Sequence, residues 1–221
     1  MLKLNSVYKK FNQQKVLGNI SIEIKTGEFL SIIGKSGVGK TTMLNILAGL
    51  IRPDEGSVNF KGEDLTSMSE EQLAEFRLHN VGIVFQDFKI FPSLSVSENI
   101  MLALYPRQDI AKSEQNRRIK EVLEQVELSH KVKEKAAILS GGEKQRVAIA
   151  RSLVGRPTIV FADEPTGNLD TTTSDTIMTL FSKLHKDLST SFMIITHDND
   201  IAKQAEKIYE LKASGLSPVS L

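Results

Sequence analysis

Two adjacent carboxylates, Asp163 and Glu164, directly follow a short apolar run at residues 159–162. An apolar run of that length is typical of a buried strand. The carboxylates then lie at the carboxyl end of the strand, which is the edge where open parallel sheets bind their ligands. An Asp and a Glu in this place can act on a phosphate group and its metal ion, provided that another part of the chain binds the phosphate.

A glycine-rich loop that can bind this phosphate follows the apolar run at residues 29–33. It matches the pattern G-x-x-x-x-G-K-[ST], in which backbone N–H groups wrap around phosphate oxygens at the start of a helix. Lys40 can reach the β- and γ-phosphates, and the Thr41 hydroxyl can ligate Mg²⁺. The alternative is an ordinary glycine-rich turn, but the apolar strand before the loop and the amphipathic helix after it favour a nucleotide site. That site comprises Gly34, Lys35, Ser36, Gly37, Val38, Gly39, Lys40, Thr41 and Thr42.

A second candidate anion site is the turn Ser140-Gly141-Gly142, which opens a helical segment. Small residues at a helix start leave the backbone N–H groups free to face an anion. Like the two carboxylates, this turn needs a phosphate to act on.

Two further polar side chains follow apolar strands, Gln86 after residues 81–85 and His197 after residues 192–195. Taken alone, Gln86 is an ordinary loop residue and a lone histidine is most often structural. Together with the phosphate loop and the carboxylate pair, however, four strand ends carry polar groups. We therefore expect these groups to meet at one edge of a mostly parallel sheet.

The remaining pattern predicts the elements that position these groups. Alternation at Ile20, Ile22 and Ile24 indicates a half-buried strand, and Ser69 with Gln72 fits a capping box. Phe11 lies in the expected loop between the first two strands, where a partly buried core aromatic is the simpler reading. Strands are also expected over 29–33, 57–60, 81–85, 159–162 and 192–195, and helices over 70–78, 97–104, 113–128, 143–153 and 173–188.

Composition limits the classes of protein that fit. The 221 residues suggest one domain or one with an inserted lobe, and 40% hydrophobic residues allow a sizeable core. Net charge is +1, which gives no electrostatic footprint for nucleic acid. Cysteine is absent, which fits a reducing compartment. We expect no signal peptide and no membrane-spanning run, so that any membrane partner is another chain.

In order, these motifs resemble the nucleotide-binding domain of ABC transporters over essentially the whole chain. The resemblance implies a P-loop α/β fold with a mostly parallel core, an N-terminal antiparallel β subdomain and an inserted helical lobe. It divides the single domain into core residues 1–86 and 158–221 and a signature lobe, 87–157. The motifs are the aromatic Phe11, Walker A at 34–41, the Q-loop Gln86, the signature at 139–143, Walker B with Asp163 and Glu164, the D-loop at 168–170 and the H-loop His197.

The resemblance also implies roles for these residues. Phe11 would stack on adenine, although tyrosine is commoner there, and Lys40 and the loop amides would hold the phosphates. Thr41, Gln86 and Asp163 would coordinate Mg²⁺. Glu164 would polarise the attacking water, with His197, Gln86 and Lys40 completing the catalytic set. Ser140, Gly141, Gly142 and Asp170 would complete the ATP site, with Ser140 and Gly142 binding the γ-phosphate held by the opposite protomer. The implied assembly is a homodimer with two ATP molecules between the subunits.

The sequence ADEPTGNLD, followed further along the chain by ITHD, resembles that of the LolD, MacB and FtsE group. Such a chain would be cytoplasmic, peripheral on the inner face of the cell membrane, and would energise lipoprotein release or peptide or macrolide export. The apolar segment Asp87–Tyr105 would receive the membrane subunit, or else form local core of the lobe. The alternatives are an FtsE-like regulatory ATPase of cell division and a soluble ABC ATPase of DNA repair or translation, which the compact span between the Walker motifs disfavours.

Overall fold

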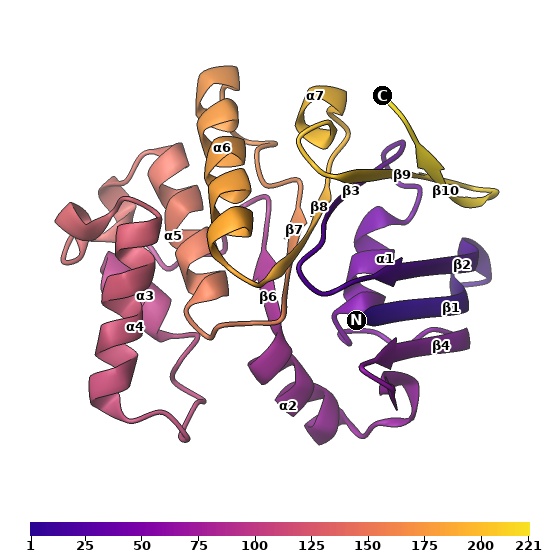
Figure 1. Ribbon diagram of the computed structural model, residues 1–221, viewed down its shortest axis with the longest axis horizontal. Helices are drawn as coiled ribbons and strands as arrows, with labels where there is room; N and C mark the ends of the chain where they lie inside the picture. Colours follow the sequence, from indigo (N-terminus) through magenta and orange to yellow (C-terminus); the bar gives the residue numbers. More distant parts are fainter.

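An antiparallel sheet forms one side of the molecule (Figure 1). The computed structural model describes residues 1–221. The strand order is β2-β1-β4-β5. Leu2 and Leu4 of β1 pair with Ile24 and Ile22 of β2, so the alternating apolar side chains share one buried face. The strands are β1 (Leu2–Phe11), β2 (Gln14–Ile24), β4 (Glu55–Phe60) and β5 (Glu63–Asp64).

A second, mostly parallel sheet crosses the middle of the molecule in the order β10-β9-β3-β8-β7-β6. Only β10 runs antiparallel to its neighbour. The strands β3 and β8 are buried along their whole length, which explains their continuous apolar runs. The strands are β3 (Phe29–Ile33), β6 (Val81–Val84), β7 (Ile159–Asp163), β8 (Ser191–Ile195), β9 (Lys207–Lys212) and β10 (Gly215–Val219). The expected α/β fold with an N-terminal antiparallel sheet is confirmed.

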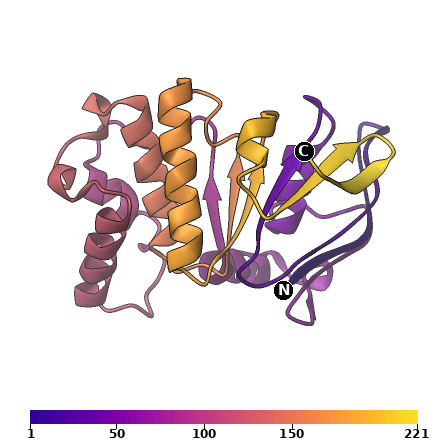
Figure 2. The same ribbon diagram turned by 45° about the horizontal axis from the view of Figure 1, so that its top comes forward.

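Helices cover both faces of the parallel sheet and divide its side chains between two apolar cores. In β7, Ile159 and Phe161 join the core around α1 and the antiparallel sheet, while Val160 and Ala162 join the core beneath α3 to α6. Figure 2 shows α6 and its neighbouring helices on one side and the antiparallel sheet on the other. The helices are α1 (Lys40–Leu47), α2 (Glu70–Asn80), α3 (Val96–Met101), α4 (Lys112–Gln125), α5 (Gly141–Leu153), α6 (Thr171–Asp187) and α7 (Asn199–Ala202), and no helix has the length and apolar character to cross a membrane.

Side-chain caps set several helix boundaries that differ from the sequence prediction. The capping box of Ser69 with Gln72 is confirmed. A second box, Ser95 with Glu98, starts α3 at Val96, so the helix predicted over 97–104 begins earlier and ends at Met101. Likewise, Asp170 caps α6, which begins at Thr171 rather than at residue 173. Phe11 is the last residue of β1 rather than part of a loop.

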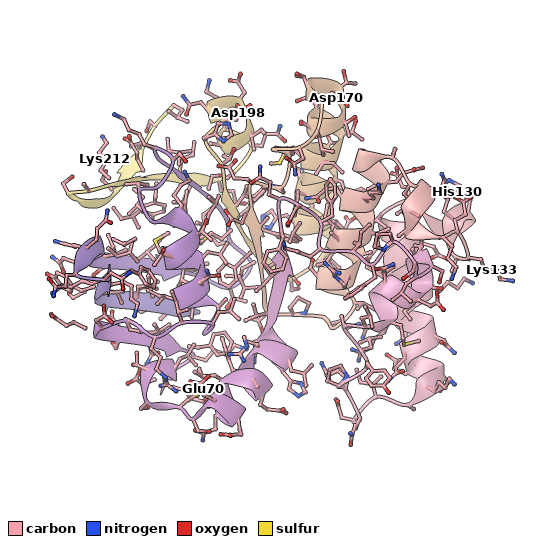
Figure 3. The ribbon with its side chains drawn as sticks, turned by 180° about the vertical axis from the view of Figure 1, so that it is seen from behind. Glu70, His130, Lys133, Asp170, Asp198 and Lys212 are labelled. Carbon is pink, nitrogen blue, oxygen red and sulfur yellow. The ribbon has the colours of Figure 1, made fainter.

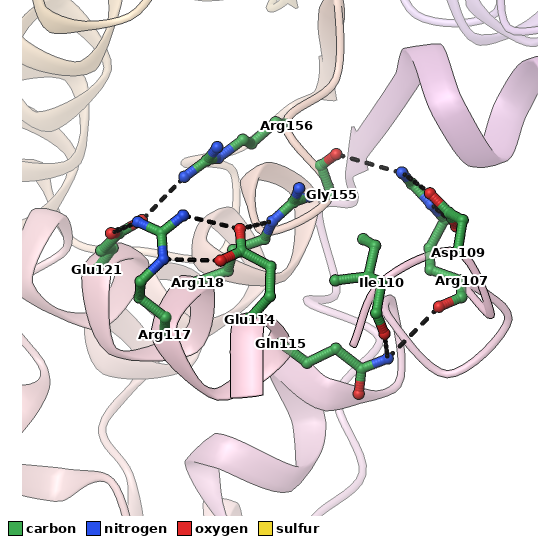
Figure 4. Close-up of polar contacts among 10 residues, drawn as sticks. All are labelled: Arg107, Asp109, Ile110, Glu114, Gln115, Arg117, Arg118, Glu121, Gly155 and Arg156. Atoms are coloured by element: carbon green, nitrogen blue, oxygen red, sulfur yellow. Dashed lines mark hydrogen bonds and ion pairs between the residues drawn. The ribbon is translucent and has the colours of Figure 1, made fainter. Parts of the chain in front are cut away.

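A polar network joins α4 to the loops around it (Figure 4). The buried Arg107 makes two hydrogen bonds to Asp109, which lower the pKa of that carboxyl to about 2, and also reaches the Gly155 carbonyl. Glu114 accepts hydrogen bonds from Arg117 and Arg118 of the same helix, and its pKa is likewise lowered to about 2. Arg156, which follows α5, reaches Glu121 of α4 at 3.1 Å and so ties this helix to the segment after α5.

Candidate functional site

The candidate site is a cavity of about 730 Å³ at the carboxyl ends of the parallel strands. The end of β3 brings the glycine-rich loop to it, β6 brings Gln86, β7 brings the carboxylates and β8 brings His197. The expected meeting of four strand ends is therefore present. The residues that line the cavity are Gln14, Val16, Ser36, Gly37, Gly39, Lys40, Thr41, Thr42, Gln86, Asp163, Glu164 and His197.

The glycine-rich loop packs closely against the start of β2. Gly39 has a φ of 107°, and a Cβ there would lie 2.8 Å from Leu17 Cδ2 and 3.0 Å from the Val16 carbonyl oxygen. Any other residue would have to move this neighbour, so glycine is required by both conformation and space. The loop can thus turn its N–H groups inward at the start of α1.

Lys40 is held inside this loop by main-chain carbonyls. It is 8% exposed, and its Nζ donates to the Gly34 oxygen at 2.7 Å and to the Lys35 oxygen at 3.3 Å. No carboxylate pairs with the ammonium group, which therefore keeps its positive charge available for an anion. This arrangement suits the binding of a phosphate group in the cavity.

Thr41 and Asp163 place two oxygen atoms side by side on the cavity wall. The Thr41 hydroxyl donates to Asp163 Oδ2 at 2.8 Å. Burial raises the pKa of Asp163, the hydrogen bond from Thr41 lowers it, and the charge of Glu164 raises it further. A hydroxyl and a carboxylate on the wall, with Gln86 at the rim, fit Mg²⁺, which binds through few protein oxygens and completes its shell with phosphate and water.

We expect Asp163→Asn to raise the melting temperature of the nucleotide-free protein at pH 7 by a few degrees. The folded-state pKa of Asp163 lies above the unfolded value, so the ionised group opposes folding increasingly as pH rises through these values. Asparagine removes this charge but still accepts the Thr41 hydrogen bond. Thermal denaturation at a series of pH values from 7.5 down to about 4 checks the prediction, because the gain should shrink as the pH falls through the raised folded-state pKa of Asp163.

Asp170→Asn is the control for this measurement. The hydrogen bonds from Thr173 lower the pKa of Asp170 in the folded state, so losing its charge should remove stability rather than add it. Equal shifts in both variants would contradict the account of Asp163.

Glu164 and His197 form a contact at the mouth of the cavity. His197 Nδ1 lies 2.9 Å from Glu164 Oε2, and the side chains are 71% and 17% exposed, respectively. Glu164 has a φ of 47°, and its N–H donates to the Ile195 oxygen at 2.9 Å. A left-handed residue other than glycine is disfavoured, and such strain is characteristic of functional sites. The carboxylate is thus fixed where it can orient a water molecule.

Gln86 lies at the rim of the cavity and is tied to the loop before α6. Asn168 Nδ2 donates to the Gln86 main-chain oxygen at 3.0 Å, and Gln86 Nε2 lies 3.5 Å from Asn168 Oδ1. Gly167 allows this approach, because a Cβ there would be 2.8 Å from Gln86 Nε2. The Gln86 side chain remains exposed toward the cavity.

The Ser140-Gly141-Gly142 turn does not line the cavity. Ser140 caps α5 by accepting from the Glu143 N–H, and a Cβ at Gly142 would be 2.6 Å from Thr173 Cγ2 at the start of α6. The turn therefore packs on α6, on the same side as Asp170. Figure 3 shows Asp170 at the start of α6 and Asp198 at the start of α7, both on the side of the molecule where β7 and β8 finish.

The remaining sequence-derived candidates are placed less centrally. Phe11 is about half exposed and belongs to neither of the two apolar cores. It pairs with Gln14, which lines the cavity, and Lys9 Nζ lies 5.5 Å from its ring centre. The sequence did not single out Gln14 or Val16, since nothing in their types marks them. They reach the cavity because the β1–β2 hairpin lies over the glycine-rich loop.

The sequence and the fold are both similar to those of known ATP-binding proteins. Residues 17–167 match the family described as ABC transporter. Over 215 residues the chain is 41% identical to the lipoprotein-releasing system ATP-binding protein LolD of Francisella tularensis, covering 96% of this chain and 93% of LolD. It is 37% identical to the macrolide export ATP-binding/permease protein MacB of Syntrophobacter fumaroxidans, covering 93% of this chain and 29% of MacB. The fold matches a dimeric ATP-binding cassette, MJ0796, in a post-hydrolysis state bound to ADP and Pi, with a TM-score of 0.87, 37% identity and full coverage of both chains.

Proposed function

The chain belongs to the ABC transporter family, and we propose that two copies of it close around ATP and thereby drive a membrane subunit. It is an ATPase and an ATP-binding subunit of the LolD and MacB type. The observation that carries the proposal is that the cavity contains only one of the two phosphate-binding loops of the chain. Its wall supplies Lys40, Thr41 with Asp163, and Glu164 with His197, whereas the Ser140 turn faces elsewhere.

Two copies of the chain would complete each other's sites. The Ser140 turn offers N–H groups at the start of α5 but lies outside its own cavity. A second copy related by a two-fold axis would bring its phosphate to this turn, and the reverse contact would follow by symmetry. MJ0796, which is 37% identical, is described as dimeric. ATP would then hold the dimer together, and hydrolysis would release it.

The residues of the cavity would act on ATP in defined ways. Lys40 would exchange its carbonyl partners for β- and γ-phosphate oxygens, and Phe11 would stack on the base from the hairpin beside Gln14. Thr41, Gln86 and Asp163 would hold Mg²⁺, which when bound neutralises charge on the phosphates. Glu164 would orient the attacking water and accept its proton, while His197 holds the carboxylate and reaches the γ-phosphate.

The membrane subunit would dock on the segment Asp87–Tyr105 and the cavity beside it. Phe91 and Tyr105 are 55% and 82% exposed, which is unusual for large apolar side chains and typical of a docking surface. By contrast, Phe88 and Ile90 pack against the core of the lobe. A cavity of about 660 Å³, lined by Ala103, Pro106, Arg151 and residues of α2, adjoins the segment. The inner residues of the segment therefore belong to the core of the lobe, whereas its outer residues would contact the membrane subunit.

We further propose that this partner is an integral membrane chain, so that the ATPase works in the cytoplasm on the inner face of the membrane. The name of MacB joins an ATP-binding part and a permease in one protein, and this chain covers 29% of it. The name of LolD describes a lipoprotein-releasing system. We propose lipoprotein release or peptide export, driven by mechanical work on a subunit with a large extracytoplasmic part. Movement of the signature lobe, residues 87–157, would transmit the closure of the ATPase dimer to that subunit.

Co-purification from gently solubilised membranes tests this proposal, using the Glu164→Gln chain with ATP. A membrane protein with few spans and a large extracytoplasmic domain supports the proposed mechanism. A permease with many spans contradicts the LolD and MacB mechanism, and recovery of soluble partners alone contradicts the membrane assignment.

In the same experiment, the double variant Phe91→Ser, Tyr105→Ser should reduce recovery of the membrane partner about tenfold or more, since buried aromatic anchors carry much of the binding energy of an interface. ATP should still stabilise this variant against heat. The control is Leu221→Ser, which removes a half-exposed apolar side chain from the opposite side of the molecule. Equal recovery with the double variant and the control would exclude this surface as the docking site.

A further inference from the structure

Arg151, near the end of α5, makes an unusual pair of contacts with the turn that follows Gln86. Its guanidinium donates to the Phe88 main-chain oxygen at 2.8 Å and also to the Lys89 oxygen. These carbonyls lie 63 and 62 residues away in the sequence. The arginine therefore joins the helix that starts at the Ser140 turn to the loop that carries Gln86.

The turn that Arg151 holds is conformationally strained. Phe88 and Lys89 have φ values of 59° and 48°, and neither is glycine. Two consecutive left-handed residues are disfavoured and persist only where the surroundings fix them. The local contacts are hydrogen bonds from the Phe88 N–H to the Phe85 oxygen and from the Lys89 N–H to the Asp87 oxygen, and an ion pair between Lys89 and Asp87. The Phe88 side chain packs on the core of the lobe, and Arg151 supplies hydrogen bonds to the turn from outside it.

The position of Arg151 is costly for the folded protein. Burial lowers the pKa of its guanidinium, and no carboxylate offsets that effect. A partly buried cation without a counter-charge opposes folding unless its hydrogen bonds are well made. Arg107 and Arg146, in contrast, each pair with a carboxylate. A charge retained at this cost to bind two carbonyls indicates a role beyond packing.

Arg151 also lines the cavity of about 660 Å³ beside the segment Asp87–Tyr105, together with Glu71 and Glu75 of α2. A chain that enters this cavity meets the guanidinium directly. The other restraint on Gln86 comes from Asn168 on the far side of the loop. Hydrogen bonds thus hold the Gln86 loop from two sides, and of their donors only Arg151 lines the cavity.

We propose that Arg151 is a positioning residue that fixes the turn at Phe88 and Lys89, so that Gln86 is presented to the nucleotide site and moves together with α5 and its Ser140 turn. This inference rests on the proposed role of Gln86 in holding Mg²⁺. Arg151 touches neither nucleotide nor metal, and it acts through the main chain of the loop.

Hydrogen–deuterium exchange of the nucleotide-free full chain tests the clamp directly. In Arg151→Gln, the Phe88 and Lys89 amides should exchange at least about tenfold faster, because they lose their outside support. Arg146→Gln is the matched control, since Arg146 lies on the same helix and donates to the Val126 carbonyl, far from this turn. Unchanged exchange in Arg151→Gln would overturn the proposal.

The second measurement is the Mg²⁺ concentration needed for ATP to stabilise the chain against heat. It should rise about tenfold in Arg151→Gln, the loss typical when a residue that orients a metal ligand is removed. Stabilisation by ATP in EDTA should be unchanged. Arg151→Lys keeps the cation, so it should show a smaller effect, and it replaces Arg151→Gln if that variant does not fold. A metal requirement equal to that of the parent chain would contradict the link to Gln86.

A rescue experiment separates positioning from simple destabilisation. Glycine adopts left-handed φ values without a Cβ clash, so adding Lys89→Gly to Arg151→Gln should restore at least half of the Mg²⁺ shift. Lys89→Ala removes the same ion pair but keeps the Cβ, and it should not rescue. Equal behaviour of the two double variants would refute the proposed strain. If the parent chain itself needs no Mg²⁺, the proposed role of Gln86 fails, whereas the exchange result still decides whether Arg151 holds the turn.

Discussion

Glu164→Gln should lower the rate of ATP hydrolysis by about 10²- to 10⁴-fold, the range expected when a general base is removed. Binding of ATP should be retained. The glutamate lies at the mouth of the nucleotide cavity, 17% exposed and 2.9 Å from His197 Nδ1. Glutamine has the same size and can keep a hydrogen bond to the histidine. It cannot take a proton from water, so hydrolysis slows while the site keeps its shape.

The same substitution should lengthen the life of the ATP-bound dimer. Asp163 and Glu164 are adjacent carboxylates, and the charge of Glu164 already raises the pKa of Asp163. Removing one negative charge from a site that binds a polyanion favours the bound state. With hydrolysis also blocked, both effects favour a closed pair of subunits. Size-exclusion chromatography with ATP should therefore show dimer for Glu164→Gln and monomer for the parent chain once its ATP is consumed.

Glu206→Gln provides the control for this experiment. Glu206 also contacts a histidine, with Oε1 at 3.1 Å from His185 Nε2, but it does not line the nucleotide cavity. Phosphate release by Glu206→Gln should match the parent chain. If Glu164→Gln turned over ATP as fast as Glu206→Gln, another group would have to activate the water.

The meeting of the polar groups at one edge of the sheet could be predicted from the sequence, because each group lies just after an apolar strand. Parallel strands place their carboxyl ends together, so the order of motifs was enough to assemble Lys40, Gln86, Asp163 and His197. The glycines of the loop were equally informative, since close backbone approach leaves few other choices at Gly39. The contact between Glu164 and His197 could not be predicted in this way. It joins residues 33 apart in the sequence and depends on the left-handed backbone conformation of Glu164, which no sequence pattern indicates.

Other features of the fold could not be predicted from the sequence, for physical reasons. The hairpin of β9 and β10 was not foreseen, because its residues are only partly buried and Pro218 argues against a strand; it is tolerated there at the edge of the sheet. The start of α3 was misplaced because Ser95 and Ser97 both offer a cap, and only Ser95 has Glu98 three residues on. Arg151 looks like an ordinary helix residue until the fold brings it to the turn after Gln86.

Lys40→Ala should weaken ATP binding about 10- to 100-fold, as expected for the loss of one charge-assisted hydrogen bond to a phosphate. In the nucleotide-free chain, Lys40 Nζ donates to the Gly34 and Lys35 carbonyls and has no acidic partner. Its charge is therefore available for the phosphates. The loss should grow with the number of phosphates, and AMP affinity should hardly change, because AMP lacks the β- and γ-phosphates that Lys40 reaches.

Comparing nucleotides separates a lost phosphate contact from a damaged fold. Lys40 is a buried cation, so its removal also relieves the cost of burying a charge, which offsets the loss of its two bonds to carbonyls. The melting temperature of the nucleotide-free variant should therefore change little. Lys183→Ala is the control, because Lys183 is exposed on α6 and does not line the nucleotide cavity. Calorimetric titration with ATP, ADP and AMP decides the matter. An equal loss for all three nucleotides would mean that Lys40 supports the loop itself, whereas a loss confined to ATP and ADP assigns the lysine to the phosphates.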